Sequence, residues 1–382
     1  MPTGDGQVAD AELRQRLVDT PGKVAGRSRV PKRSRVAAVA IIGLVASSSG
    51  AHAHVSCWQR PAPESLEEAA IHANNQQLRL ARQQETQRRT QPAVLALSDG
   101  ELRIAFGAGL LVGWGETGYR PELQAVTAVG KSALMAPFAF LGSEGDSRIA
   151  DLFNCPSGTS WDALAEQASR LVDAHVLARI AQRHAAGARV MIALPGSAAR
   201  PEHVFDVGAI AASGHPDAQR YIGDILRASV DLARAVDPKA IPFPAGLQVE
   251  RNWVFRKVGA GQPFLWPPIP NAAAPAAYFL IHNGVLFADE SDEFVTTERA
   301  ARAERVQRLA VGLAPAFDLQ MRASAEKSRF QFASLRPRLN LVAQDVFDAT
   351  YLRDVFHFAY RQGRMSKEWK PSLPTLGRSG VR

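Results

Sequence analysis

The sequence is poor in the residues that hold metal ions and covalent cross-links. Cysteine occurs only twice among 382 residues, as Cys57 and Cys155, and the nine histidines are scattered. No histidine has a paired spacing with a cysteine or a carboxylate, as a metal site requires, so the sequence indicates no metal ion. One disulfide is open to an exported chain, although the separation of the two cysteines in sequence gives it no geometric support.

The sequence also lacks the motifs that bind nucleotide phosphates. Residues 130–132, Gly-Lys-Ser, are similar to the end of a phosphate-binding loop, but Ala125 stands where that loop requires a glycine. The glycines between Gly107 and Gly113 miss the dinucleotide-binding spacing by one residue, and close helix packing explains them better. We therefore expect no cofactor.

The basic charge of the chain is concentrated at its N-terminus. Residues 1–53 hold eight Lys or Arg and four Asp or Glu, so their removal would lower the formal charge from +8 to +4. In the rest of the chain no aromatic motif that stacks on bases lies among basic residues. A nucleic-acid partner is therefore not expected.

The same N-terminal segment has the pattern of a secretory signal. A run of about eleven apolar residues, Val36–Ala46, follows a basic cluster and precedes Ala51-His52-Ala53. The run is too short to span a bilayer, whereas a basic flank and an Ala-x-Ala site are what export and cleavage require. We expect cleavage after Ala53 and a periplasmic or secreted chain; a disordered basic tail is the alternative.

Cys57 follows closely on this expected cleavage site. Exported bacterial proteins often carry a lipidated cysteine in such a place, although the residues before Cys57 lack the usual leucine at the third position back. Membrane anchoring through Cys57 therefore stands beside the disulfide as an open alternative.

The remainder of the chain predicts one large α/β domain. Three short apolar segments read as buried strands, Ala93–Leu97, Ala125–Val129 and Arg189–Leu194, and helical patterns follow the first two. Repeated βα units favour a parallel sheet, so we expect these strands to be adjacent. We expect a polar linker over residues 54–92, the domain over 93–370 and a disordered tail over 371–382.

Two helical regions are expected further along. Apolar residues keep helical spacing from Trp161 to Ala186, where Gly187 is expected to end the helix. The segment Ala300–Gln362 also predicts helices, with aromatic residues near its end as a packing face.

Several stretches resemble the patatin-like phospholipase family, in its bacterial exported branch. The resemblance is carried by Phe106–Leu111, Gly118–Pro121 and Ala136–Gly142, and it extends over roughly residues 93 to 370. It implies a three-layer α/β sandwich with a central, mainly parallel sheet. It also implies serine-type hydrolysis of acyl lipids, with a glycine-rich oxyanion loop, a Gly-x-Ser-x-Gly nucleophile elbow and an Asp base.

The oxyanion loop departs from the family pattern. Of the residues expected there, only Gly100 and Arg103 remain, while Asp99, Glu101 and Ile104 replace glycines. A carboxylate about 4 Å from a forming oxyanion would destabilise it by about 1 to 4 kcal/mol at an effective dielectric constant of 20 to 80. The loop is therefore unsuited to catalysis.

The elbow and the base depart as well. Gly130 occupies the position of the nucleophile, and Ser132 is either a surrogate nucleophile or an ordinary helix N-cap. The segment expected to hold the base, Phe255–Phe264, contains no Asp. Asp206 lies in an earlier element, where a turn residue that bonds its own backbone is the simpler interpretation.

Two hypotheses follow from these departures. The favoured one is a patatin-like protein with impaired catalysis that retains binding of a lipid or a protein. The alternative is an active lipid acyl hydrolase that uses surrogate residues such as Ser132. An acyl lipid or a membrane surface is the partner that the resemblance implies, and the sequence identifies no protein partner.

Overall fold

In the computed structural model the chain divides into two units, Met1–Ala53 and His54–Arg382. The structure describes residues 57–59, 92–156, 158–194, 203–231, 274–284, 314–335, 343–365 and 368–373, all of which belong to the second unit. The predicted signal segment, most of the linker, and Phe255–Phe264 lie outside the described residues.

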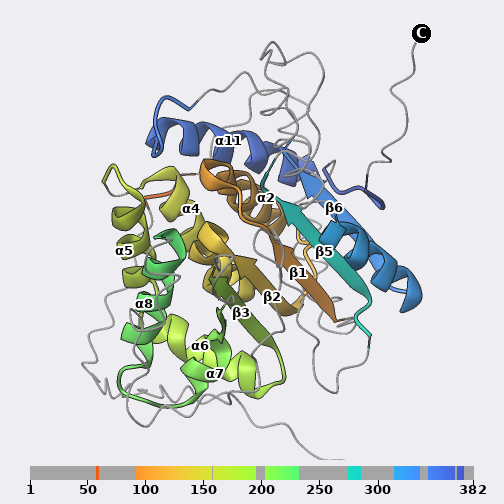
Figure 1. The fold of residues 1–382 in the computed structure, drawn as a ribbon, viewed down its shortest axis with the longest axis horizontal. Helices are drawn as coiled ribbons and strands as arrows, with labels where there is room; N and C mark the ends of the chain where they lie inside the picture. Colours follow the sequence, from red (N-terminus) through yellow and green to blue (C-terminus); the bar gives the residue numbers. More distant parts are fainter. Residues whose placement is uncertain are drawn as a thin grey trace, which may run out of the picture. The chain divides into compact units, whose positions relative to one another are not determined.

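The second unit is an α/β fold around a six-stranded sheet in the order β4-β3-β2-β1-β5-β6 (Figure 1). All neighbouring pairs are parallel except β3 and β4. The strands are β1 (Ala93–Leu97), β2 (Leu123–Val129), β3 (Arg189–Leu194), β4 (His203–Asp206), β5 (Ala277–His282) and β6 (Arg329–Ser334).

The first three strands confirm the sequence-based prediction. β1 and β3 have the expected bounds, β2 begins two residues earlier than expected, and the three are adjacent. β1 is buried along its whole length because helices cover both faces of the sheet. A parallel sheet covered on both sides requires continuous apolar strands, and this is the pattern that the sequence carries.

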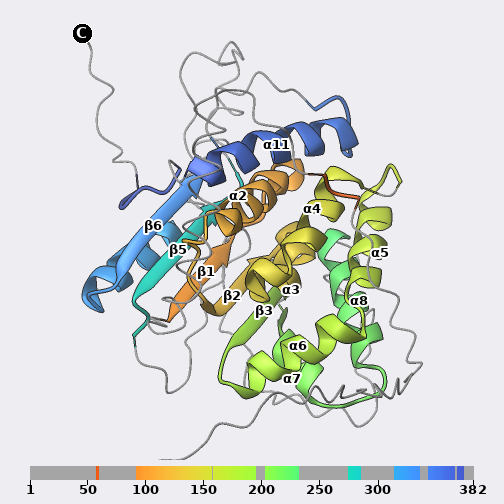
Figure 2. The same ribbon diagram turned by 180° about the vertical axis from the view of Figure 1, so that it is seen from behind.

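Helices and short 3₁₀ segments follow the strands, and the two views of the ribbon show their layers (Figures 1 and 2). They are η1 (Glu101–Arg103), α2 (Ile104–Glu116), η2 (Gly130–Met135), α3 (Ala136–Phe140), η3 (Gly142–Glu144), α4 (Asp146–Asn154), α5 (Trp161–Leu171), α6 (Ala174–Ala185), α7 (Val207–Ala212), α8 (Ala218–Val230) and α11 (Ala349–Met365).

The larger core lies between one face of the sheet and the layer that contains α2 and α11. α2 is buried almost throughout, and its Gly109 and Gly113 lie against the α11 backbone at Phe356 and Tyr360. A Cβ atom at either glycine would overlap with a carbonyl oxygen of α11. The interpretation of these glycines as helix-packing residues is therefore confirmed.

A second core covers the opposite face of the sheet. Residues 314–325 form a helix whose Ala316, Leu319 and Ala323 pack against β1, β5 and β6. Helices on both faces are consistent with the expected three-layer arrangement.

The predictions of both helical regions were wrong in part. The region from Trp161 to Ala186 holds two helices, because Asp173 accepts a hydrogen bond from Val176 N–H and begins α6 with a new N-cap. The C-terminal segment contains β6 before α11, so Ala300–Gln362 is not helical throughout. Gly187, with φ +95°, follows α6 as predicted.

The expected C-terminal tail begins later than predicted. Lys370 forms a β-bridge with Phe332 of β6, and Leu373 is buried with its N–H donating to Gln320 Oε1 at 2.9 Å. Residues 371–373 therefore pack on the domain, and 374–382 lie outside the described part.

Cys57 and Cys155 form a disulfide that fixes residues 57–59 to the domain. Trp58 lies beside the rings of Phe356 and Tyr360 of α11, with 5.2 Å between centroids in both pairs. A sulfur in a disulfide cannot also form the thioether of a lipid anchor. The structure therefore corrects the alternative that Cys57 carries a lipid.

Candidate functional site

The carboxyl ends of three neighbouring strands bring the candidate site residues together. Ser98–Gly100 follow β1, Gly130–Ser132 follow β2, and His282–Gly284 end β5. The chain continues from β1 to β2 on one side and returns to β5 on the other, so this edge is a topological switch point. Ligands of open parallel sheets bind at such points.

The turn after β2 is the segment in which the family resemblance predicts a nucleophile elbow. Val129 is extended, at φ −122°, and Gly130 has φ +56° before η2 begins. This is the strand–turn–helix geometry in which a strained residue presents its side chain at the apex. A Cβ atom at Gly130 would overlap with Asp99 Oδ2, so the carboxylate of Asp99 fills the space of the missing side chain.

Asp99 also bonds to the backbone of the loop in which the family resemblance predicts an oxyanion site. Its Oδ1 accepts a hydrogen bond from Gly100 N–H at 2.8 Å. Burial raises the pKa of Asp99 above its ordinary value, while the nearby Lys131 ammonium opposes this effect. The carboxyl group thus occupies an N–H donor of the loop, which a catalytic oxyanion site would need to keep free.

A surface ion pair joins the loop to the elbow. Lys131 Nζ lies 2.7 Å from Glu101 Oε2, with the lysine side chain 14% exposed and the glutamate 70% exposed. Glu101 has φ +52°, which a glutamate adopts only at some cost in free energy. Lys131 Nζ also lies 5.2 Å from the centre of the Trp161 ring. Lys131 therefore forms an ion pair with Glu101 and interacts electrostatically with Asp99. None of these three side chains is arranged as a nucleophile.

Ser132 is fully buried and has both of its hydrogen-bonding roles filled. Its hydroxyl donates to Ser98 O and accepts from Asn283 Nδ2, the latter at 3.0 Å. The expectation of an ordinary N-cap is wrong, because Ser132 lies inside η2 and no side-chain cap bond forms there. As a surrogate nucleophile Ser132 would need an exposed oxygen and a base that accepts its proton. Here the hydroxyl is buried and donates its hydrogen bond to a backbone carbonyl, which is not a base.

Asn283 holds the carboxyl ends of the strands together. Its N–H donates to Ser98 Oγ at 2.9 Å, and its Nδ2 donates to Ser98 O at 2.7 Å as well as to Ser132. Its Oδ1 accepts from Gly107 N–H of α2 at 2.9 Å. We call Ser98, Ser132 and Asn283 the buried polar cluster; all three are fully buried. A buried amide with its groups paired in this way fixes the geometry of its neighbours.

Sequence reasoning missed Asn283, although a signal was present. Residues 277–281 are apolar, and His282-Asn283-Gly284 follow at once, as polar residues do where a strand reaches a functional edge. Its partner Ser98 is 185 residues away in sequence, and only the pairing of β1 with β5 brings them together.

His282, beside Asn283, is a buried and uncharged histidine. Its Nδ1 lies 2.9 Å from Gly284 O, and burial lowers the pKa of His282 to about 4. A histidine with this pKa is uncharged at pH 7. The ring therefore contributes packing and a backbone contact at the edge of the sheet.

The remaining predicted site residues have structural positions. A Cβ atom at Gly100 would lie 2.6 Å from the Asn283 backbone, so this glycine permits close approach of the two loops. Arg103 is exposed at the start of α2. Asp206 accepts from Ala209 N–H at 2.8 Å and caps α7, which agrees with a local backbone role.

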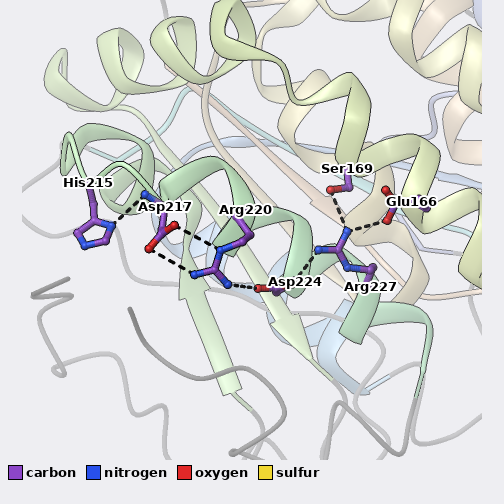
Figure 3. Close-up of polar contacts among 7 residues, drawn as sticks. All are labelled: Glu166, Ser169, His215, Asp217, Arg220, Asp224 and Arg227. Carbon is purple, nitrogen blue, oxygen red and sulfur yellow. Dashed lines mark hydrogen bonds and ion pairs between the residues drawn. The ribbon is translucent and has the colours of Figure 1, made fainter. Parts of the chain in front are cut away.

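A second cluster of charges lies on α8, away from the strand ends (Figure 3). Asp217, Arg220, Asp224 and Arg227 alternate in sign at spacings of three and four residues, and Arg227 Nη1 reaches Glu166 of α5 at 2.8 Å. We call these four residues of α8 and its N-cap the charge ladder. Such spacing is typical of a solvated helix face, so the charge ladder is a structural feature.

No protein-family model matches the chain, and no curated protein is significantly similar to it. Among the residues that the structure describes, no group of three or more His, Cys, Asp or Glu could hold a metal ion. Within the same residues, no helix has both the length and the apolar character needed to cross a membrane.

Proposed function

We propose that this chain is a patatin-like protein that has lost acyl hydrolase chemistry and retains the binding of a lipid or a protein. The support comes from the sequence and from the structure together. The sequence resembles the family in its scaffold and departs at the loop, the elbow and the base. The strand ends then hold an apex without a side chain, at Gly130, in a backbone geometry suited to a nucleophile.

The position of Asp99 is the observation that carries this proposal. A missing serine alone would leave an empty apex that water or a ligand group could enter. The Asp99 carboxylate instead fills this space and takes the Gly100 N–H. An acyl carbonyl brought to the elbow would meet a carboxylate where its oxyanion needs N–H donors, and loss of one such donor costs about 100- to 1000-fold in rate.

The alternative, an active hydrolase that uses Ser132, requires a rearrangement of the buried polar cluster. Ser132 would have to give up its bonds to Ser98 and Asn283 before its oxygen could reach a substrate. Breaking a satisfied buried polar network leaves groups unpaired, and each costs about 1 to 3 kcal/mol.

A fluorophosphonate probe tests the proposal directly. We expect no labelling of the purified chain and background hydrolysis of short-chain acyl esters, in the parent protein and in Ser132→Ala alike. Robust turnover that Ser132→Ala abolishes would overturn the proposal and identify Ser132 as the nucleophile. An authentic serine hydrolase treated with the same probe is the positive control, because its activated serine must be labelled.

The scaffold can be tested by restoring the whole family pattern. We expect measurable esterase activity once the loop, the elbow and an acidic base are present together. The substitutions are Asp99→Gly, Glu101→Gly, Ile104→Gly, Ala128→Gly, Gly130→Ser and Ser132→Gly, with an Asp at Lys257 or Val258.

We also propose that the chain is exported and cleaved near Ala53. The Cys57–Cys155 disulfide supports this proposal, because disulfides form and persist in oxidising compartments. N-terminal sequencing of protein from cells should find a new terminus shortly before Cys57. An intact Met1 in the cytoplasmic fraction would refute export.

A further inference from the structure

A cavity that is open to solvent lies around Trp161, and none of its lining residues belongs to the site described above. Its volume is about 440 Å³, and its walls come from the start of α5, the end of α8 and the loop before α11. α5 and α8 lie side by side (Figure 1). A volume of this size accommodates a small organic molecule.

Part of the cavity wall is aromatic and apolar. The Trp161 and Phe347 rings meet edge to face at 5.3 Å between centroids, and Trp161 Nε1 donates to Val346 O at 3.2 Å. Val230 adds a further apolar wall, and the Val346 side chain is 77% exposed. An aromatic corner with exposed aliphatic groups offers contact area to a ligand that carries methyl or methylene groups.

The charge on the remaining wall has one sign. Asp162, Asp231 and Asp345 line the cavity, and none of the described lining residues is a lysine or an arginine. Val230 and Asp231, at the C-terminal end of α8, also line the cavity, and a helix C-terminus carries partial negative charge. The nearby Lys131 is engaged with Glu101. The cavity therefore favours a cation over an anion.

We propose that this cavity binds a small organic cation, with an ammonium or quaternary ammonium group attached to a short apolar body. The aromatic faces of Trp161 and Phe347 would contact the alkylated nitrogen, and the Asp162 and Asp345 carboxylates would supply the complementary charge. The same Trp161 ring already attracts one cation, the Lys131 ammonium. The proposal stands independently of whether the elbow is catalytic.

Choline and its neutral isostere 3,3-dimethylbutan-1-ol form a matched pair of probes, since they differ in one charge and share a shape. We expect choline to bind the whole purified chain with a Kd of about 1 mM and the neutral alcohol at least about tenfold more weakly. Ligand-observed NMR titration measures both. Equal affinities, or no choline binding, would overturn the proposal.

Variants locate the site. Asp162→Asn and Asp345→Asn should each weaken choline binding about two- to fivefold, and Trp161→Leu should weaken it at least about tenfold, whereas Trp161→Phe should retain most of it. Asp354→Asn, which removes the same charge from the exposed face of α11, should change nothing. Circular dichroism of each variant confirms folding, and a loss with Asp354→Asn equal to that with Asp345→Asn would place binding elsewhere.

Discussion

The buried polar cluster and the charge ladder use similar groups in opposite surroundings. At the strand ends, Ser98, Ser132 and Asn283 are fully buried, so each hydrogen bond replaces one that water can no longer make. On α8, Arg220 and Asp217 are exposed and Asp224 is 25% exposed, so water can reach the groups of both ion pairs. Burial, rather than the number of polar contacts, therefore decides which cluster the fold depends on.

The largest effect is expected from Asn283→Leu. The change removes the amide that pairs with Ser98, Ser132 and Gly107, and it leaves several buried groups without partners. We expect the free energy of unfolding to fall by about 3 to 5 kcal/mol, measured by urea denaturation. A loss below about 1 kcal/mol would show that the cluster has little importance for stability.

Loss of the disulfide should come next in size. Its cysteines are 98 residues apart in sequence, and closing a loop of this length stabilises a fold by about 2 to 5 kcal/mol. We expect Cys57→Ser with Cys155→Ser to lower the free energy of unfolding by that amount and to release Trp58 from α11. A reducing agent should destabilise the parent protein and leave the double variant unchanged.

The contact between Asp99 and Gly130 should appear as an energetic coupling. Gly130→Ser alone should destabilise the chain by about 1 to 3 kcal/mol, since the new side chain overlaps with the Asp99 carboxylate. Asp99→Gly should recover much of this loss, and a double-mutant cycle measures the coupling. Additive effects of the two substitutions would show that Asp99 does not fill the elbow.

Asp99 also predicts a pH dependence. Its pKa is raised in the folded chain, so the folded state binds the proton more tightly than the unfolded state does. The contribution of Asp99 to stability is therefore most favourable below its unfolded pKa and declines as pH rises through the folded pKa. The stability of Asp99→Asn relative to the parent should increase over this range. Urea unfolding of both proteins from pH 3 upward measures this difference in stability. If the two stability curves run parallel with pH, the raised pKa of Asp99 is contradicted.

The smallest effect is expected in the charge ladder. Arg220→Gln removes contacts to Asp217 and Asp224 on a solvated helix face. We expect its urea midpoint to match that of the parent protein within error, because exposed ion pairs contribute little. A clear loss of stability here would remove the contrast with the buried polar cluster.

Much of the central scaffold was determined by the sequence. The apolar runs fixed β1 and β3 because strands covered on both faces must be apolar throughout, and Gly187 ended α6 because it adopts positive φ. The sequence also located the turn at Gly130, since this glycine follows directly on a recognisable strand. These features depend on residues that are close together along the chain.

Tertiary structure alone decided the features that join distant segments. The pairing of β1 with β5 brought Asn283 to Ser98, and packing on α4 and α11 brought Cys57 to Cys155. The break between α5 and α6 at Asp173, and β6 within an expected helical region, were also missed from the sequence. That Asp99 fills the space above Gly130 follows from the approach of two loops in the folded chain, a distance that local pattern does not contain.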